Sequence, residues 1–161
     1  TDVFRADERG LPIDISKYNY YDPREFWIKE RSTKRGNMLL KKSDFYIIQS
    51  KERLVVPYDY AVEIVPTDET LLEARIHYAG FAHPGFGYTA DDKVEGRTLV
   101  FEVRPRDVPL VVCDGKFFAK LYFHKMNEIP VETYNKSANS YSEQGKRTHI
   151  LSKVFKQWDA P

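Results

Sequence analysis

An all-β fold is predicted by two features of the sequence. From Met38 onward, short runs rich in valine, isoleucine, phenylalanine and tyrosine recur between turn residues, at a spacing typical of sandwiches and barrels. Within two of these runs, 74–79 and 99–104, side chains alternate with the two-residue period of a strand. The runs are not separated by stretches of helix length, which would have indicated βαβ units.

The composition is that of one soluble globular domain. The chain has 161 residues, 42% hydrophobic and 30% charged, with a formal net charge of +1. This length allows one core, and the balanced charge gives no reason to expect nucleic acid as a partner. No membrane association is expected, because no apolar run approaches the roughly 18 to 20 residues that cross a bilayer. With a polar N-terminus and Cys113 as its one cysteine, the chain is expected to be cytoplasmic.

Residues 1–37 are expected to form an N-terminal arm wrapped on the domain. Asp22-Pro23 followed by Glu25 is a typical helix start, which predicts a short helix over 23–31 that ends in a turn at 34–37. The aromatic side chains of the arm are expected to bury it against the barrel or a neighbouring subunit rather than to stack on bases. They are Tyr18, Tyr20, Tyr21, Phe26 and Trp27.

Residues 38–135 are expected to form the β domain, and residues 136–161 a polar C-terminal arm. Asp114-Gly115 is the strongest hairpin signal in the sequence. Near the end of the chain, apolar residues between Ile150 and Phe155 fall at helical spacing. The strands are predicted at 45–49, 54–56, 61–65, 74–81, 98–104, 110–113 and 116–123.

Several kinds of active site lack their residues here. Zinc-dependent base deaminases need a His-x-Glu and a Cys-x-x-Cys, but no histidine is followed two residues later by glutamate, and there is one cysteine. A Walker A loop, a Gly-x-Gly-x-x-Gly loop and a Gly-x-Ser-x-Gly elbow are also missing. Cys113 lies in an apolar run and is expected to be an inert core residue.

Glu102 is the candidate for acid–base chemistry. Its neighbours Val100, Phe101 and Val103 are apolar, so its face of the strand is expected to be at least partly buried. Burial raises the pKa of a carboxyl group and allows it to move protons near neutral pH. The alternative is a glutamate on a solvated sheet face, paired with a nearby arginine.

The order of motifs over residues 39–144 resembles the dCTP deaminase and dUTPase superfamily. In that family an Asp-Pro-Gly-aromatic turn, matched by residues 83–86, precedes a strand ending in apolar-apolar-Glu, matched by 100–102. Segment 126–134 ends on a tyrosine that would pack against the nucleotide, and 141–144 resembles a C-terminal Tyr-x-x-Gln motif. The resemblance is greatest to the second half of a double-length bacterial branch, so these residues would be half of such a chain.

This resemblance implies a dUTPase-like distorted β-barrel or jelly-roll (β-clip), and a zinc-independent deamination of dCTP. Glu102 would be the catalytic acid/base. Mg²⁺ would accompany the triphosphate, with no metal held by the protein. The partners would be a deoxycytidine nucleotide and further copies in a homotrimer, or a tandem half-domain in a pseudo-trimer. The residues contacting the nucleotide would be Ala79, Gly80, Phe81, His83, Val100, Phe101, Tyr134 and Gln144.

Parts of the family's phosphate-binding residues are missing. Its Arg-Ser-Ser-x-x-Arg loop would fall near 65–70, where Asp68 and Glu69 would repel a triphosphate. His83 replaces the family's aspartate, and Ser140 its lysine before the Tyr-x-x-Gln motif. The alternative is therefore a non-catalytic half-domain that provides trimer contacts or a regulatory nucleotide pocket. A third possibility is dUTP hydrolysis, against which His83 argues mildly.

Overall fold

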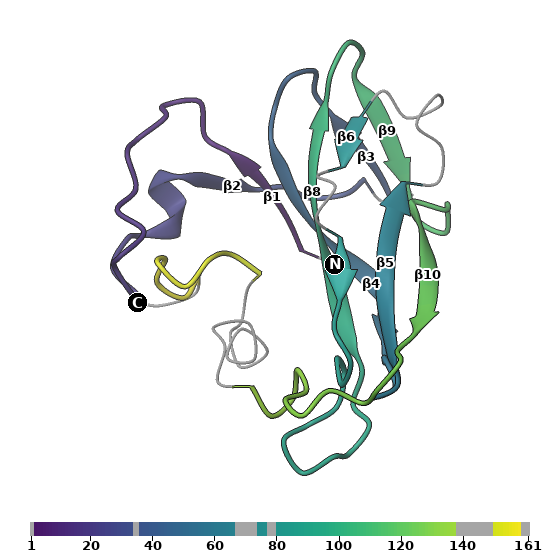
Figure 1. The fold of residues 1–161 in the computed structure, drawn as a ribbon. Helices are drawn as coiled ribbons and strands as arrows, with labels where there is room; N and C mark the ends of the chain where they lie inside the picture. Colours follow the sequence, from purple (N-terminus) through teal and green to yellow (C-terminus); the bar gives the residue numbers. More distant parts are fainter. Residues whose placement is uncertain (1, 34–35, 67–73, 77–79, 138–149, 159–161) are drawn as a thin grey trace.

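The computed structural model describes residues 2–33, 36–66, 74–76, 80–137 and 150–158, and these are almost entirely β (Figure 1). The all-β prediction is therefore confirmed. The elements in chain order are β1 (Val3–Ala6), the 3-10 helix η1 (Pro23–Glu25), β2 (Trp27–Lys29), β3 (Asn37–Leu40), β4 (Tyr46–Leu54), β5 (Tyr60–Pro66), β6 (Ala74–Ile76), β7 (Phe81–Ala82), β8 (Arg97–Pro105), β9 (Leu110–Cys113) and β10 (Ala119–Lys125).

Over the described residues the strands form three antiparallel sheets. The largest has the order β2-β1-β4-β8-β6, a second has the order β10-β5-β7, and β3 pairs with β9. The register of β4 and β8 shifts between Gln49 and Arg53, so the regular pairing of these two long strands is interrupted there. Figure 1 shows β8 beside β6 in one layer and β5 beside β10 in another.

The main core lies on one face of the five-stranded sheet. Tyr46 faces Val103, and Ile48 faces Phe101, across the β4–β8 ladder, so the four side chains share that face. All four are buried. Partly buried side chains from the other two sheets pack against them, among them Ile64, Leu110, Val112 and Ala119.

The two ends of the chain pack together on the opposite face of β1. There Phe4 is fully buried with Leu151, Val154 and Phe155, and aromatic side chains from the N-terminal segment surround them. The backbone joins the same segments, since Tyr20 N–H donates to Val154 O at 2.8 Å. Figure 1 shows η1, β2 and the yellow C-terminal segment gathered on one side of the molecule, away from β5 and β10.

The predicted helix over 23–31 is wrong, because a single helical turn forms and a strand replaces the rest. Pro23 opens a 3-10 turn, and the Asp22 side chain accepts a hydrogen bond from Arg24 N–H at 2.9 Å, as expected of an N-cap. The chain then forms β2, in which Ile28 pairs with Arg5 of β1. A helix this short has little stability of its own, so pairing with a distant strand decides the conformation of these residues.

The predicted hairpin at Asp114-Gly115 is also wrong, although the turn forms. Gly115 has a φ of 76°, and Lys116 N–H donates to Cys113 O at 3.3 Å. The strands on either side, however, pair with β3 and β5 and not with each other. The dipeptide specifies a local change of direction, whereas strand pairing is set by burial over the whole domain.

Candidate functional site

Glu102 lies on the exposed face of β8. Phe101 and Val103 are buried in the main core, whereas Val100 is 47% exposed and Glu102 is exposed with it. Across the ladder Glu102 is opposite Ile47. The expectation of a partly buried face is therefore wrong within this chain. Side chains alternate between the two faces of a strand, so the apolar neighbours on either side of Glu102 point into the core instead of around its carboxylate.

The two other candidates on β8 differ from each other. The side chain of Phe101 packs edge-on to Phe118, with ring centroids 5.1 Å apart, inside the main core. Any contact of Phe101 with a nucleotide would therefore come from its backbone. Val100 is beside Glu102 on the exposed face, where its side chain is accessible.

A second group of candidates forms an aromatic cluster, which we define as Phe81, His83, Phe86 and Tyr134. The His83 ring is edge-on to Phe81 at 4.9 Å and nearly parallel to Tyr134, at 15° and 6.4 Å between centroids. Phe86 packs on Tyr134 at 5.2 Å, and the guanidinium of Arg97 lies 5.6 Å from the centre of the Tyr134 ring. The fold thus brings Phe81 and His83, which are close in the sequence, together with Tyr134, which belongs to a separate motif.

Part of this cluster is presented to solvent. Phe81 is 51% exposed and His83 is exposed, while Tyr134 is half-buried. Aromatic surfaces of this kind, with a guanidinium beside them, are suited to the planar base or the sugar of a nucleotide.

Gly80 is placed by close packing against β5. Its carbonyl oxygen accepts a hydrogen bond from Ile64 N–H at 2.7 Å. A Cβ atom at this position would lie 2.7 Å from the Cβ of Ile64, which real contacts do not allow. Glycine is therefore required here to hold Phe81 and the strand β7 against β5.

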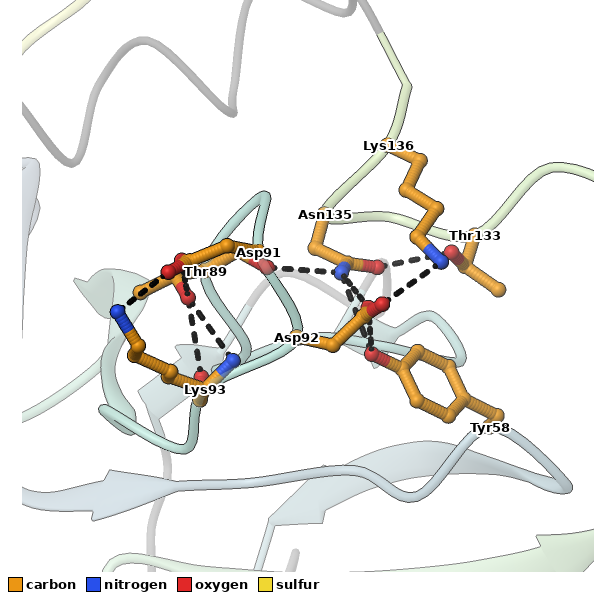
Figure 2. A network of polar contacts seen from close by, with 8 residues as sticks. All are labelled: Tyr58, Thr89, Asp91, Asp92, Lys93, Thr133, Asn135 and Lys136. Atoms are coloured by element: carbon orange, nitrogen blue, oxygen red, sulfur yellow. Dashed lines mark hydrogen bonds and ion pairs between the residues drawn. The ribbon is translucent and has the colours of Figure 1, made fainter.

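A polar network fixes the segment that carries Tyr134 (Figure 2). The Tyr58 hydroxyl donates to Asp92 Oδ1 at 2.6 Å, and Lys136 Nζ lies 3.0 Å from Asp92 Oδ2. Asn135 Nδ2 lies within hydrogen-bond distance of Thr89 O, at 2.9 Å, and of Asp92 Oδ1, at 3.0 Å. We define the Asn135 network as these residues together with Thr133, whose hydroxyl donates to Asn135 Oδ1 at 2.8 Å.

The electrostatics of the network favour one protonation state. Hydrogen bonds from Tyr58, Lys136 and Asn135 lower the pKa of Asp92, which stays ionised. Desolvation, together with donation to Asp92, raises the pKa of Tyr58, which stays protonated. Sequence reasoning misses these residues, because they come from three separate segments and form no motif. Their one local signal is that Asn135 and Thr133 flank Tyr134.

The chain does not bring Glu102 and the aromatic cluster into one site. Arg97, which contacts Tyr134, begins β8, and Glu102 lies five residues further along, about 16 Å at 3.3 Å per residue. An odd separation also places their side chains on opposite faces of the strand. Ala79 and Gln144, and the sequence departures at 68–69 and 140, lie outside the described residues.

Two general features complete the description of the site. Among the described residues, no group of three or more histidine, cysteine, aspartate or glutamate side chains is arranged to hold a metal ion. None of the helices in the described ranges is long and apolar enough to span a membrane.

The antiparallel sheets form a β domain of the dUTPase-like type. Residues 2–155 match the family described as the 2'-deoxycytidine 5'-triphosphate deaminase (DCD), C-terminal domain, and the chain belongs to this family.

One solved structure makes the relation concrete. The fold is similar to the crystal structure of 2'-deoxycytidine 5'-triphosphate deaminase from Agrobacterium tumefaciens, with a TM-score of 0.70 and 33% sequence identity. The match covers 80% of this chain but 37% of that chain, so the domain spans well under half the length of its relative. No curated protein sequence matches the chain.

Proposed function

We propose that this domain takes part in the hydrolytic deamination of dCTP to dUTP and ammonia, with Glu102 as the acid/base. The observation that carries the proposal is the family match over residues 2–155, with a glutamate kept on the accessible face of β8. Val100 beside it offers apolar surface to a pyrimidine, and the solvent-facing part of the aromatic cluster, which lies away from Glu102 within one chain, would reach the same nucleotide from a neighbouring copy.

Glu102 would move protons at one carbon of the base. As a water oxygen bonds to C4 of cytosine, the carboxylate takes a proton from that water and passes it to N3. It then takes the remaining hydroxyl proton and delivers it to the amino group. The C4–N4 bond breaks, ammonia leaves, and C4 becomes the carbonyl of uracil. The water supplies every atom that is added, and the glutamate ends as it began.

The remaining candidate residues would hold the nucleotide. Backbone groups of residues 79–81 would read the edge of the base, and Tyr134 and Gln144 would close on the sugar and phosphates. Mg²⁺ would enter as the counter-charge of the triphosphate, bound chiefly by phosphate oxygens.

A second polypeptide surface would have to cover Glu102. In the single chain its carboxylate is hydrated, whereas an acid/base is tuned by an apolar or charged surrounding. We infer that this cover comes from a neighbouring copy in a homotrimer, or from a tandem half-domain in a pseudo-trimer. Such a partner would also supply the cations that residues 65–70 lack.

A non-catalytic half-domain is the second candidate function. It is favoured by the separation of Glu102 from the aromatic cluster, and by the acidic residues where the family binds phosphates. Such a domain would bind a nucleotide in a regulatory pocket, or none, and would release no ammonia.

Incubation of the longest natural polypeptide that carries these residues with dCTP separates the two candidates. Deamination predicts equal amounts of dUTP and ammonia. A thermal-shift series with dCTP, dUTP, dTTP and no ligand shows which nucleotide stabilises the fold, because a bound ligand raises the melting temperature by mass action. Stabilisation by a nucleotide without ammonia release would refute the proposal in favour of a regulatory pocket. A protein that neither responds to nucleotides nor releases ammonia would refute both deamination and the regulatory pocket, and would favour a half-domain that provides trimer contacts alone.

A further inference from the structure

We propose that Asn135 is a positioning residue that fixes Tyr134 in the nucleotide site, and that it does so through Asp92 and Tyr58. The inference rests on the proposed function in one respect, since it takes Tyr134 to contact the nucleotide. The argument that Asn135 fixes Tyr134 depends only on hydrogen bonds and packing within this chain.

Asn135 is buried, with 8% of its surface exposed, and both the oxygen and the nitrogen of its carboxamide have hydrogen-bond partners (Figure 2). The oxygen accepts from the Thr133 hydroxyl, while the nitrogen faces three acceptors, the Thr89 carbonyl, the Asp92 carboxylate and the Tyr58 hydroxyl. A carboxamide has two hydrogens to donate and one oxygen to accept. No other side chain of similar size combines these functions, and a buried network that is fully connected holds its members rigidly.

The network acts on Tyr134 because Asn135 is the next residue in the chain. The Asn135 side chain enters the network, and the Tyr134 ring faces His83 and Phe86 in the aromatic cluster. The main chain is held at the same point, where Tyr134 N–H donates to Pro84 O at 2.9 Å. Loss of the Asn135 contacts would therefore release the tyrosine from one of the two sides that fix it.

Asp92 can hold Asn135 in place because the loop between β7 and β8 fixes the position of Asp92. The loop closes on itself, as Thr89 N–H donates to Lys93 O at 2.9 Å and Gly96 N–H to Gly87 O at 2.8 Å. Asp92 has a φ of 61°, a left-handed conformation that is uncommon for a residue other than glycine. Its carboxylate contacts Tyr58, Asn135 and Lys136. The loop therefore connects the turn between β4 and β5, where Tyr58 lies, to the segment after β10.

Gly85 shows how closely the Asn135 network is packed. Its φ is 84°, and a Cβ atom there would lie 2.7 Å from Asn135 Oδ1 and 3.1 Å from the Tyr58 ring. The turn that carries His83 and Phe86 thus rests directly on the Asn135 carboxamide. Both partners of Tyr134 in the aromatic cluster are placed by the same network.

The first test is the isosteric substitution Asn135→Asp in the longest natural polypeptide. It replaces the donating nitrogen with an acceptor facing Asp92, so the contacts that hold the segment become repulsive. We expect the KM for dCTP to rise about 10-fold, the scale of losing one aromatic stacking contact, with kcat within about 2-fold. The matched control is Lys93→Ala in the same loop, because the Lys93 ammonium pairs with the exposed Asp91 and not with Asn135, Asp92 or Tyr58. It should leave KM unchanged.

The second test asks whether Asn135 acts through Tyr134. In Tyr134→Ala the anchored ring is gone, so adding Asn135→Asp should raise KM no further. Effects on KM that multiply in the double variant would overturn the inference. So would a melting temperature lowered by Asn135→Asp while KM stays at the wild-type value, since that pattern describes a structural residue only.

A third measurement reads the positioning without any activity. Amide hydrogen exchange at Tyr134 should be about 10-fold faster in Asn135→Asp, with the β4–β8 amides unchanged. Asp92→Asn, which removes a charge at a half-exposed site, gives the same readout if Asn135→Asp does not fold. Unchanged exchange at Tyr134 in a folded variant would overturn the inference. A wild-type protein that releases no ammonia would instead refute the proposed function, whatever the exchange rates show.

Discussion

Phe101 and Glu102 are neighbours in β8, yet they lie on opposite faces of the five-stranded sheet. Phe101 is opposite Ile48 in the main core, whereas Glu102 is exposed and is opposite Ile47, which is partly buried against the cluster of Phe4, Leu151, Val154 and Phe155. Phe101 therefore packs in the core between the sheets, whereas the Glu102 carboxylate is accessible to a substrate. A substitution at Glu102 can therefore test catalysis without disturbing the core.

Glu102→Gln should abolish ammonia release while leaving the fold and the affinity for the nucleotide largely intact. Loss of a proton-transferring group lowers rates on the order of 10²-fold or more. The melting temperature should hardly change, because the side chain is exposed. The rate of ammonia release is measured beside Glu52→Gln, an exposed strand glutamate on β4 that should keep wild-type turnover. Near wild-type turnover in Glu102→Gln would eliminate Glu102 as the acid/base.

Deamination should survive chelation of transition metals and weaken when Mg²⁺ is removed. The first expectation follows from the single cysteine and the missing His-x-Glu, and the second from the role of Mg²⁺ as counter-charge to the triphosphate. Assays with a chelator selective for transition metals, and with Mg²⁺ omitted, check the two parts. Elemental analysis that finds one tightly bound zinc per chain would contradict the first.

Strands whose signal is local are predictable from the sequence, and contacts made over long distances are not. Alternation in 98–104 predicts β8 to within one residue at each end, and the apolar run 110–113 coincides with β9. In contrast, the helix signal at Pro23 holds for one turn, and it is overridden by pairing with β1, a partner that no local pattern identifies. The predicted strand 54–56 is not a regular strand beyond Leu54. Val56 exchanges backbone hydrogen bonds with residues 85–86 without forming a regular strand.

The candidate site is predictable to the extent that it consists of motifs. His83 and Tyr134 belong to separate motifs, and the fold places their rings nearly parallel. The exposure of Glu102 is not predicted, because its apolar neighbours along the chain are not its neighbours in space. Asn135 and Asp92 give no signal, since hydrogen bonding across 43 residues leaves no pattern in the sequence.

Asp92→Asn should destabilise the domain at neutral pH, and its difference from wild type should shrink in acid. Hydrogen bonds from Tyr58, Lys136 and Asn135 lower the pKa of Asp92 in the folded state. A lowered carboxyl pKa stabilises the fold above the pKa of the unfolded chain, and this contribution is lost as pH falls through the folded value. The gap in melting temperature between the two proteins should therefore be widest near pH 7 and should close below about pH 4.

Thermal melts of both proteins between neutral and acidic pH check this prediction. Asp107→Asn, at an exposed position between β8 and β9, serves as the control and should stay close to wild type near pH 7. A gap between Asp92→Asn and wild type that is constant over the whole range would show that the carboxylate charge is not what the network uses.

Residues 1–161 alone should bind dCTP weakly, and the longest natural polypeptide should bind it well. A triphosphate carries several negative charges, and the resembled family holds them by charge-assisted hydrogen bonds, each worth roughly 1.5–3 kcal/mol. Segment 65–70 offers Asp68 and Glu69 in their place. The loss of two such bonds would weaken binding by roughly 10²- to 10⁴-fold, before any repulsion is counted.

Titration calorimetry with dCTP on residues 1–161 measures this binding directly. Asp68→Asn combined with Glu69→Gln keeps the shapes of both side chains and removes their charges, so it should bind dCTP more tightly than the parent if repulsion contributes. The same pair of changes should be without effect on binding of uncharged deoxycytidine, which carries no phosphate to be repelled. Lys116 and Lys120 would compensate for the missing arginines only if they pointed at the phosphates, and Lys120 is exposed on β10. Micromolar or tighter dCTP binding by residues 1–161 alone would show that the phosphate site is complete in this chain, and that 65–70 is not the segment that binds phosphate.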